Sequence, residues 1–471
     1  MLFSSTVFLY LFLPSVLLIY FVILRKKRGL QNGFLVFASL FFYAWGEPVF
    51  VLVMILTVLL TWAFGMGIER QKDDPKLKKF FLIFSVVCLL SVLFICKYLG
   101  FACSLLKKII PSLSVPGIPL PIGISFFTFQ AISYIIDVYR GKAQAQKNLL
   151  YVGLYISFFP QLIAGPIVRY QTVAEEIKNR KENMDDFSDG FARFVIGLSK
   201  KVLLSNKLAL IADQAFAMLQ NGDELSVTFS WLGGIAFTMQ IFFDFSGYSD
   251  MAIGLGRMFG FHFGENFNYP YIAGSVSDFW RRWHISLGQF FRDYVYFPLG
   301  GSRGGTLKTI MNLFIVWFLT GLWHGANLTF IMWGLMYFVL ITAEKLSGIE
   351  KKKSVIIKIA GHIYTVLFAV FGMVLFNSDT IQNAVKYWGM MTGAFGNSFT
   401  DGMFSGYFTQ NLLWLAVSAV LCTPVFRYIG KKTEKSEIAG WIRVAGMMAL
   451  FVLCAANIVS DSYNPFIYFN F

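Results

Sequence analysis

The feature that most constrains the fold of this chain is a succession of long apolar segments. Segments such as 3–24, 48–67 and 356–376 each approach the length of about 20 residues that an α-helix needs to cross the hydrocarbon core of a bilayer. Charged residues make up only 14% of the chain, whereas soluble proteins carry about 25%. A membrane β-barrel would show short segments of alternating polarity instead. The sequence therefore predicts an all-α polytopic membrane protein.

The apolar segments give about 11 or 12 crossings. The expected spans are 3–24, 31–45, 48–67, 79–97, 122–138, the later part of 191–219, 226–245, 307–323, 327–344, 356–376, 410–426 and 439–459. Residues 149–167 end in a stretch that contains Pro160, Gly165 and Pro166, so a re-entrant segment is expected there. Because no repeat of 20–50 residues is visible, residues 1–471 are predicted to form one membrane domain.

The formal net charge of +14 is concentrated in short clusters between the apolar segments. Such clusters are typical of cytoplasmic loops under the positive-inside rule, and no nucleic-acid motif accompanies them. The sequence thus indicates a membrane protein surrounded by lipid, with no nucleic-acid partner. Since Arg25–Arg28 follows the first apolar segment, that segment is expected to be a retained helix, and both termini are expected to be extracytoplasmic.

The five cysteines lie in or near apolar segments, at positions 88, 96, 103, 422 and 454. They show neither a Cys-x-x-Cys pattern nor a Cys/His ligand spacing, so no metal site is expected. They are predicted to be small core residues.

Two of the four histidines, His284 and His324, each follow a tryptophan and lie 40 residues apart. Imidazole changes protonation near neutral pH and can carry a proton between reacting groups. An ionisable side chain at membrane depth is costly, so each is a functional-site candidate. The predicted topology lets His284 approach from the cytoplasm and places His324 toward the outer end of span 307–323.

Residues 277–297 are predicted to form one amphipathic helix at the cytoplasmic interface, capped by Ser277. The aromatic residues Trp280 and Trp283 would share its apolar face with His284, while Arg281, Arg282 and Arg292 would lie off that face. These arginines could bind the phosphates of a coenzyme A thioester, and lipid headgroups explain them equally well. For His284 the alternative is an interfacial histidine beside an anchoring aromatic belt.

Around the second histidine, Gly321 and Gly325 flank the Trp323-His324 pair and allow backbone or substrate to come close. Burial would keep the ring neutral, which is the form a general base needs. Asn327 could orient this ring. The alternative is a histidine that bonds a carbonyl where two helices pack.

A third polar stretch, residues 240–256, holds Asp244, Tyr248 and Asp250 in an apolar setting. Such groups need internal partners. They would line a tunnel wall or cap broken helices, and the glycines of this stretch are too weak a pattern for a nucleotide loop.

Five motifs together resemble the membrane-bound O-acyltransferase family, in particular its alginate O-acetylation branch. They cover residues 123–130, 243–254, 278–287, 291–301 and 322–326, within a motif core of about 120–345. The resemblance implies a helical fold with re-entrant and interfacial helices around a central tunnel, located in the cell membrane of a bacterium. It also implies that His324 is the catalytic histidine and His284 the second histidine of the motif; related members carry asparagine or aspartate in place of His284.

The same resemblance implies transfer of an acyl group, usually acetyl, to a hydroxyl of an extracytoplasmic polysaccharide or of a partner protein. The donor would be a cytoplasmic thioester such as acetyl-CoA, with no bound cofactor. A separate extracytoplasmic acetyltransferase is the expected partner. Two alternatives stay open: D-alanyl transfer to teichoic acid from a carrier protein, and a transporter or flippase for acyl donors or glycan precursors, although transporters usually show internal repeats.

Overall fold

The computed structural model describes residues 1–349, 354–433, 435–460, 463 and 465. Within these residues all regular secondary structure is helical, which confirms the predicted fold class. The chain divides into two compact units, one formed by residues 1–194 and 248–264 and the other by residues 195–247 and 265–471. The expectations of a single domain and of a central tunnel stay predictions.

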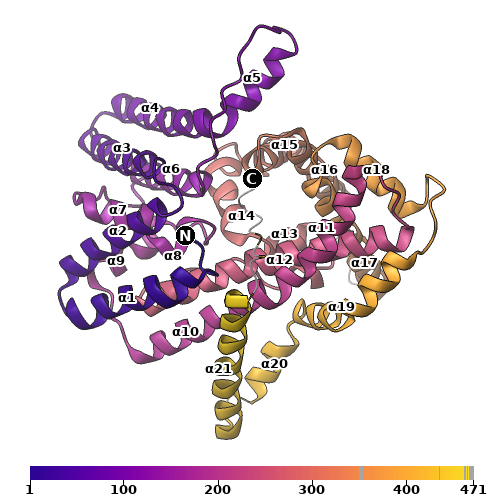
Figure 1. The fold of residues 1–471 in the computed structure, drawn as a ribbon. Helices are drawn as coiled ribbons and strands as arrows, with labels where there is room; N and C mark the ends of the chain where they lie inside the picture. The colour runs from indigo at the N-terminus through magenta and orange to yellow at the C-terminus, as the bar shows by residue number, and fades with distance from the viewer. Residues whose placement is uncertain (350–353, 434, 461–462, 464, 466–471) are drawn as a thin grey trace. The chain divides into compact units, whose positions relative to one another are not determined.

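The first unit contains the helices of the N-terminal part of the chain. In chain order they are η1 (Phe8–Phe12), α1 (Leu13–Leu18), η2 (Ile19–Ile23), α2 (Arg28–Ala44), α3 (Val51–Arg70), α4 (Pro75–Leu93), η3 (Phe94–Tyr98), α5 (Leu99–Lys107), α6 (Ile124–Tyr139), α7 (Leu149–Ser157), α8 (Phe159–Leu162) and α9 (Tyr170–Asn179). Helices α3, α4 and α6 pack side by side (Figure 1).

The boundary between the units falls within α10 (Met184–Ser199) and α12 (Val227–Met258). The second unit contains η4 (Lys200–Ser205), α11 (Asn206–Asn221), η5 (Pro270–Ile272), α13 (Val276–Arg282), α14 (Ile285–Phe291), η6 (Arg292–Tyr296), α15 (Gly305–His324), α16 (Leu328–Ser347), α17 (Val355–Asn377), α18 (Ile381–Thr392), α19 (Gly402–Leu421), α20 (Val425–Lys432) and α21 (Glu437–Ser460).

Seven helices of the described chain are long and apolar enough to cross a membrane, or eight if the bent pair α19–α20 is one span. The sequence predicted about 11 or 12 crossings. The difference arises because several predicted spans are shorter helices here: Phe8–Ile23 and Ile124–Tyr139 have fewer than 18 residues, and α2 has 17. The chain is nevertheless a multi-pass membrane protein, as expected.

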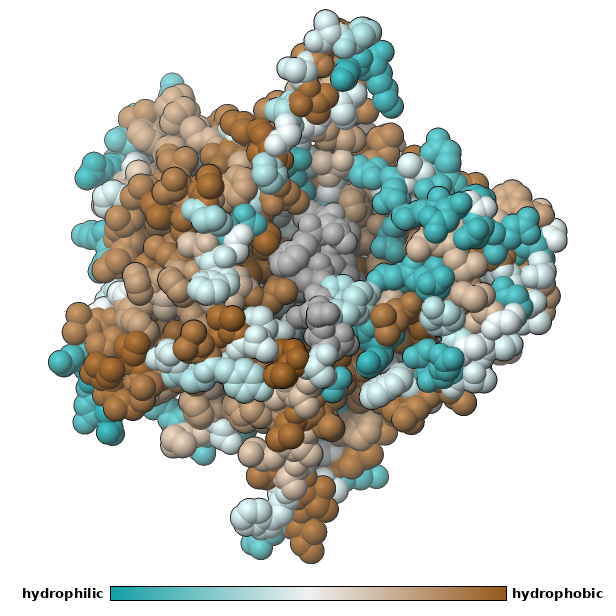
Figure 2. All heavy atoms as spheres, viewed as in Figure 1, coloured by the Kyte–Doolittle hydropathy of each residue, from teal (hydrophilic) through white to brown (hydrophobic). Residues whose placement is uncertain are grey.

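Apolar side chains cover much of the surface of these helices, as lipid contact requires. In the first unit Leu11, Val22, Phe37 and Leu52 are all more than 60% exposed. Figure 2 shows hydrophobic side chains over the helices of this unit. Helix α21 in the second unit is similarly exposed, with only 6% of its apolar window buried.

Two predicted segments differ from the expectation, and a third breaks where the sequence indicated. The segment 149–167 breaks at Phe158 between α7 and α8, as Pro160 led us to expect. The predicted span 226–245 is too short, because α12 continues through the polar motif to Met258. The predicted span 410–426 is bent by 64° between α19 and α20, where Pro424 removes a backbone donor.

Candidate active site

Part of the site is formed by three short helices that follow α12 in the chain, namely α13, α14 and η6. Helix α13 begins at Ser275, whose hydroxyl accepts a hydrogen bond from the Asp278 N–H at 3.0 Å. The prediction that Ser277 caps this helix was wrong. Ser277 instead donates its hydroxyl to Glu344 of α16 at 2.6 Å, and Glu344 also accepts from the Val276 and Ser277 N–H groups at 2.6 and 2.8 Å. A buried carboxylate from α16 therefore anchors the start of α13.

The helix that leads from α13 toward η6 is interrupted at the first candidate histidine. Trp283 is extended and His284 has a left-handed backbone with φ of 44°. The prediction of one continuous helix over 277–297 was therefore wrong. A non-glycine residue with positive φ is uncommon, and such conformations gather at functional sites, where surrounding structure must hold them.

Asn266 holds the His284 segment through several hydrogen bonds. Its backbone carbonyl accepts from the Ile285 N–H at 2.9 Å, and its side-chain Oδ1 lies 3.2 Å from His284 Nδ1. The same Oδ1 accepts from the Ser286 N–H and hydroxyl. His284 is only 2% exposed, and this burial lowers the pKa of its imidazole to about 3, so the ring is neutral near pH 7.

The second candidate histidine, His324, is the last residue of α15; its position toward the outer side of the membrane stays a prediction. Helix α15 is joined to α16 by a short connection, and the two helices pack tightly side by side (Figure 1). A Cβ added at Gly321 would meet the carbonyl oxygen of Phe330, and one added at Gly334 would meet that of Trp317. The two glycines let the backbones approach closely and so fix the end of α15.

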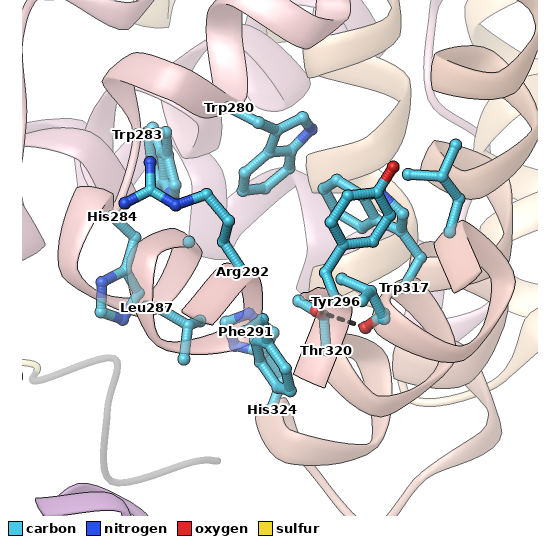
Figure 3. A pocket seen from close by; sticks show the side chains of 13 residues that line it. Trp280, Trp283, His284, Leu287, Phe291, Arg292, Tyr296, Trp317, Thr320 and His324 are labelled. Atoms are coloured by element: carbon cyan, nitrogen blue, oxygen red, sulfur yellow. Dashed lines mark hydrogen bonds between the residues drawn. The ribbon is translucent and has the colours of Figure 1, made fainter. Parts of the chain in front are cut away.

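Both histidines line one cavity of about 180 Å³ in the second unit. Its walls are mainly apolar and aromatic, and Figure 3 shows them as sticks. The lining residues come from the segment 280–296 and from α15. They are Trp280, Trp283, His284, Leu287, Gly288, Phe291, Arg292, Tyr296, Leu313, Val316, Trp317, Thr320 and His324.

The two imidazoles are connected by aromatic contacts. The ring centroid of Trp323 lies 5.7 Å from that of His284 and 4.9 Å from that of His324. His324 is also enclosed by the rings of Trp333 and Phe376, at 4.9 and 5.1 Å. Most of these contacts are edge-to-face, so the rings hold His324 in a defined orientation within an apolar environment.

The structure thus places Trp280, Trp283 and Arg292 on the cavity wall with both histidines, and Trp323 against both imidazoles. The other two predicted arginines do not line this cavity. Arg282 bonds Asp278 at 3.0 Å, and the 62% exposed Arg281 lies 3.8 Å from the same carboxylate. Both arginines therefore pair with a carboxylate of their own helix, α13, and do not line the cavity.

Asn327 has a different role from the one expected. Its oxygen accepts from the Thr329 N–H at 3.2 Å, and its amide donates to the Asp379 carbonyl at 2.9 Å. Within the described residues these are its two side-chain hydrogen bonds, and neither goes to His324. Asn327 caps α16 and links it to the start of α18.

The polar residues of α12 find internal partners, as their burial requires. Asp244 forms an ion pair with Lys201 of η4 at 2.6 Å, and both side chains are at most 2% exposed. Tyr248 and Asp250 belong to the first unit. There Tyr248 stacks on Phe3, and Asp250 pairs with Arg193 at 2.9 Å.

Sequence reasoning missed several residues that build this site, above all Asn266 and Glu344. Asn266 lies 18 residues before His284, and Glu344 lies 67 residues after Ser277. The sequence did contain one indication of the role of Glu344. It is a carboxylate at the end of an apolar segment, and a buried carboxylate needs hydrogen-bond donors. The described residues contain no cluster of three or more His, Cys, Asp or Glu that could hold a metal ion.

Comparison with known proteins adds independent evidence. The model of the membrane-bound O-acyltransferase family matches residues 37–378. The chain is 38% identical to a probable alginate O-acetylase of Pseudomonas putida, over all of both chains. It is 30% identical to a peptidoglycan O-acetyltransferase of Helicobacter pylori, over 100% of this chain and 98% of the relative. A teichoic acid D-alanyltransferase of Bacillus subtilis is 32% identical over 50% of this chain and 64% of its own length.

Proposed function

Because the chain belongs to the membrane-bound O-acyltransferase family, we propose that it transfers an acetyl group from a cytoplasmic thioester to a polysaccharide hydroxyl outside the cell. The observation that carries this proposal is the shared cavity, which has His284 and His324 on a mainly apolar wall. Two imidazoles in such a cavity suit proton transfer during acyl transfer. Acetyl-CoA is the proposed donor, and no bound cofactor is needed.

In this mechanism His324 is the general base. Its imidazole accepts the proton of the acceptor hydroxyl as the oxygen attacks the thioester carbonyl. The C–O bond forms, the C–S bond breaks, and the departing thiolate takes up the proton to leave as a thiol. Positioned proton transfer of this kind contributes about 10²–10⁴-fold in rate, and holding both reactants in one cavity contributes further.

The cavity wall supports the binding of the two substrates. Arg292 lies on the wall, where its guanidinium also bonds Asp293 at 2.9 Å. A cation at this place suits the anionic part of a coenzyme A thioester. The aromatic walls formed by Trp280 and Trp317 exclude water from the reacting thioester, which limits hydrolysis.

The acceptor and the partner follow from the relatives. Two of the relatives named above act, by their names, on alginate or peptidoglycan, which contain polysaccharide chains, and the third acts on teichoic acid. We therefore extend the proposal to a bacterial cell-surface polysaccharide, reached directly or through a separate extracytoplasmic acetyltransferase. The proposed location is the cell membrane, with both termini extracytoplasmic.

The test uses purified protein in detergent or nanodiscs with radiolabelled acetyl-CoA. We expect His324→Ala to lower acetyl transfer at least 10²-fold while the protein stays folded. His262→Ala is the matched control, because His262 is 52% exposed and pairs with Glu176 in the first unit. Acetyl transfer that persists in His324→Ala, or that is lost equally in His262→Ala, would contradict the proposed role.

Teichoic acid D-alanylation remains the second candidate, because one relative with that activity matches half of the chain. Offering a D-alanyl carrier-protein thioester in the same assay separates the two donors. Transfer from the carrier thioester without transfer from acetyl-CoA would favour D-alanylation. Uptake of either donor into sealed vesicles without any transfer would instead indicate a transporter.

A further inference from the structure

The side-chain oxygen of Asn266 is the meeting point of three polar groups from the His284 segment. The Ser286 N–H donates to this Oδ1 at 3.2 Å, and the Ser286 hydroxyl donates to it at 2.9 Å. His284 Nδ1 lies 3.2 Å from the same oxygen. Asn266 is 1% exposed and Ser286 is 9% exposed, so these contacts are shielded from water.

The Ser286 N–H determines which way the amide of Asn266 points. If the amide were rotated by half a turn, its NH₂ group would face the Ser286 N–H, and two donors would meet in a buried place. The oxygen must therefore face Ser286 and His284. An amide oxygen only accepts hydrogen bonds, so the His284 contact is a hydrogen bond only when Nδ1 carries the proton.

We propose that Asn266 is a positioning residue that fixes His284 as the Nδ1–H tautomer, leaving Nε2 as the nitrogen with the lone pair. A neutral imidazole has one proton, so Nε2 then acts only as an acceptor. The low pKa that burial gives this ring keeps it neutral across the physiological range.

The tautomer decides what His284 can do in the proposed reaction, and this inference rests on that proposed function. His284 with its proton on Nδ1 cannot protonate the departing thiolate through Nε2. It can instead accept a hydrogen bond from an N–H or O–H group of a substrate, because His284 is one of the residues that line the cavity. His284 would thus orient a substrate while His324 takes the proton.

The backbone supports the same arrangement. The Asn266 carbonyl accepts from the Ile285 N–H at 2.9 Å, next to the left-handed turn at His284. The Asn268 N–H donates to the Arg282 carbonyl at 2.9 Å on the other side of that turn. Asn266 and its neighbours therefore hold the break between α13 and α14 as well as the ring itself.

Nitrogen NMR of protein labelled only at histidine tests the tautomer without any assay of activity. The chain has four histidines, so few signals are expected, and the loss of one pair in His284→Asn assigns this ring. We expect a protonated Nδ1 and an unprotonated Nε2 in the native protein. The opposite tautomer, or an imidazolium, for this ring in the native protein would overturn the inference.

A variant pair then tests the consequence for the reaction. We expect Asn266→Ala to give a mixture of tautomers and to lower kcat about 10- to 100-fold with little change in KM, as for other residues that orient a functional histidine. Asn268→Ala is the control, because that side chain is exposed and, within the described part of the chain, only the backbone of Asn268 forms hydrogen bonds. Native tautomer or native kcat in Asn266→Ala would refute the inference, whereas full activity of His324→Ala would refute the proposed function instead.

Discussion

At the scale of single residues, the left-handed backbone of His284 explains which amino acids suit this position. Histidine, asparagine and aspartate are several-fold enriched among non-glycine residues with positive φ. These are the three residue types that the family resemblance places at this position. The same residue therefore provides both the backbone turn at φ of 44° and a side chain that lines the cavity.

This conformation leads to a prediction about stability that is separate from catalysis. His284→Asn and His284→Val both remove the imidazole, but only valine is β-branched and poorly suited to a left-handed backbone. We expect His284→Val to be less stable than His284→Asn by about 1–2 kcal/mol. Thermal unfolding of both variants in the same detergent measures the difference. Equal stability would show that the backbone at this position is not left-handed.

At the scale of helices, the close contact of α15 and α16 determines where His324 lies. Gly321 lies one turn before His324, and a Cβ there would meet the Phe330 carbonyl of α16. Because backbone cannot move aside as a flexible side chain can, a methyl group at this position must push the two helices apart.

We therefore expect Gly321→Ala to lower thermal stability and to reduce acetyl transfer more than ten-fold, since a shift of about 1 Å can cost about 10²-fold in rate. Gly406 of α19 is the matched control, because a Cβ there would meet nothing within 4 Å. Gly406→Ala should keep full activity and gain up to about 1 kcal/mol of stability from higher helix propensity. Similar behaviour of the two variants would contradict the proposed packing role.

The same scale shows why the sequence revealed some elements and not others. The length of an apolar segment and the spacing of its glycines can be read from neighbouring residues alone. Helix α15, which ends at His324, and the adjacent helix α16 were therefore predictable. The break at His284 was not, because local periodicity fits one helix and the interruption depends on Asn266 far earlier in the chain. Asp244 pairs with Lys201, and Ser277 donates to Glu344. In both pairs the partner comes from a distant segment, and a single sequence does not reveal such contacts.

At the scale of the whole molecule, the topology decides which compartment supplies each substrate. Only one candidate span, Pro75–Lys107, lies between the α3–α4 loop and the loop that contains residue 112. We therefore expect these two loops to lie on opposite sides of the membrane. The basic residues near Lys72 favour the cytoplasmic side for the first loop.

We expect single cysteines to report this orientation in a variant that lacks the five native cysteines. Lys72, Ser112 and Arg303 are exposed positions. In intact cells a membrane-impermeant maleimide should label Ser112→Cys, and it should label Lys72→Cys and Arg303→Cys only after the membrane is opened. Retained acetyl transfer in the cysteine-free background is the control. Labelling of Lys72→Cys from outside would contradict the orientation of the α3–α4 loop. Arg303 lies between η6 and α15, both of which line the cavity, so labelling of Arg303→Cys from outside would require a donor from outside the cell, where acyl thioesters of coenzyme A are not made.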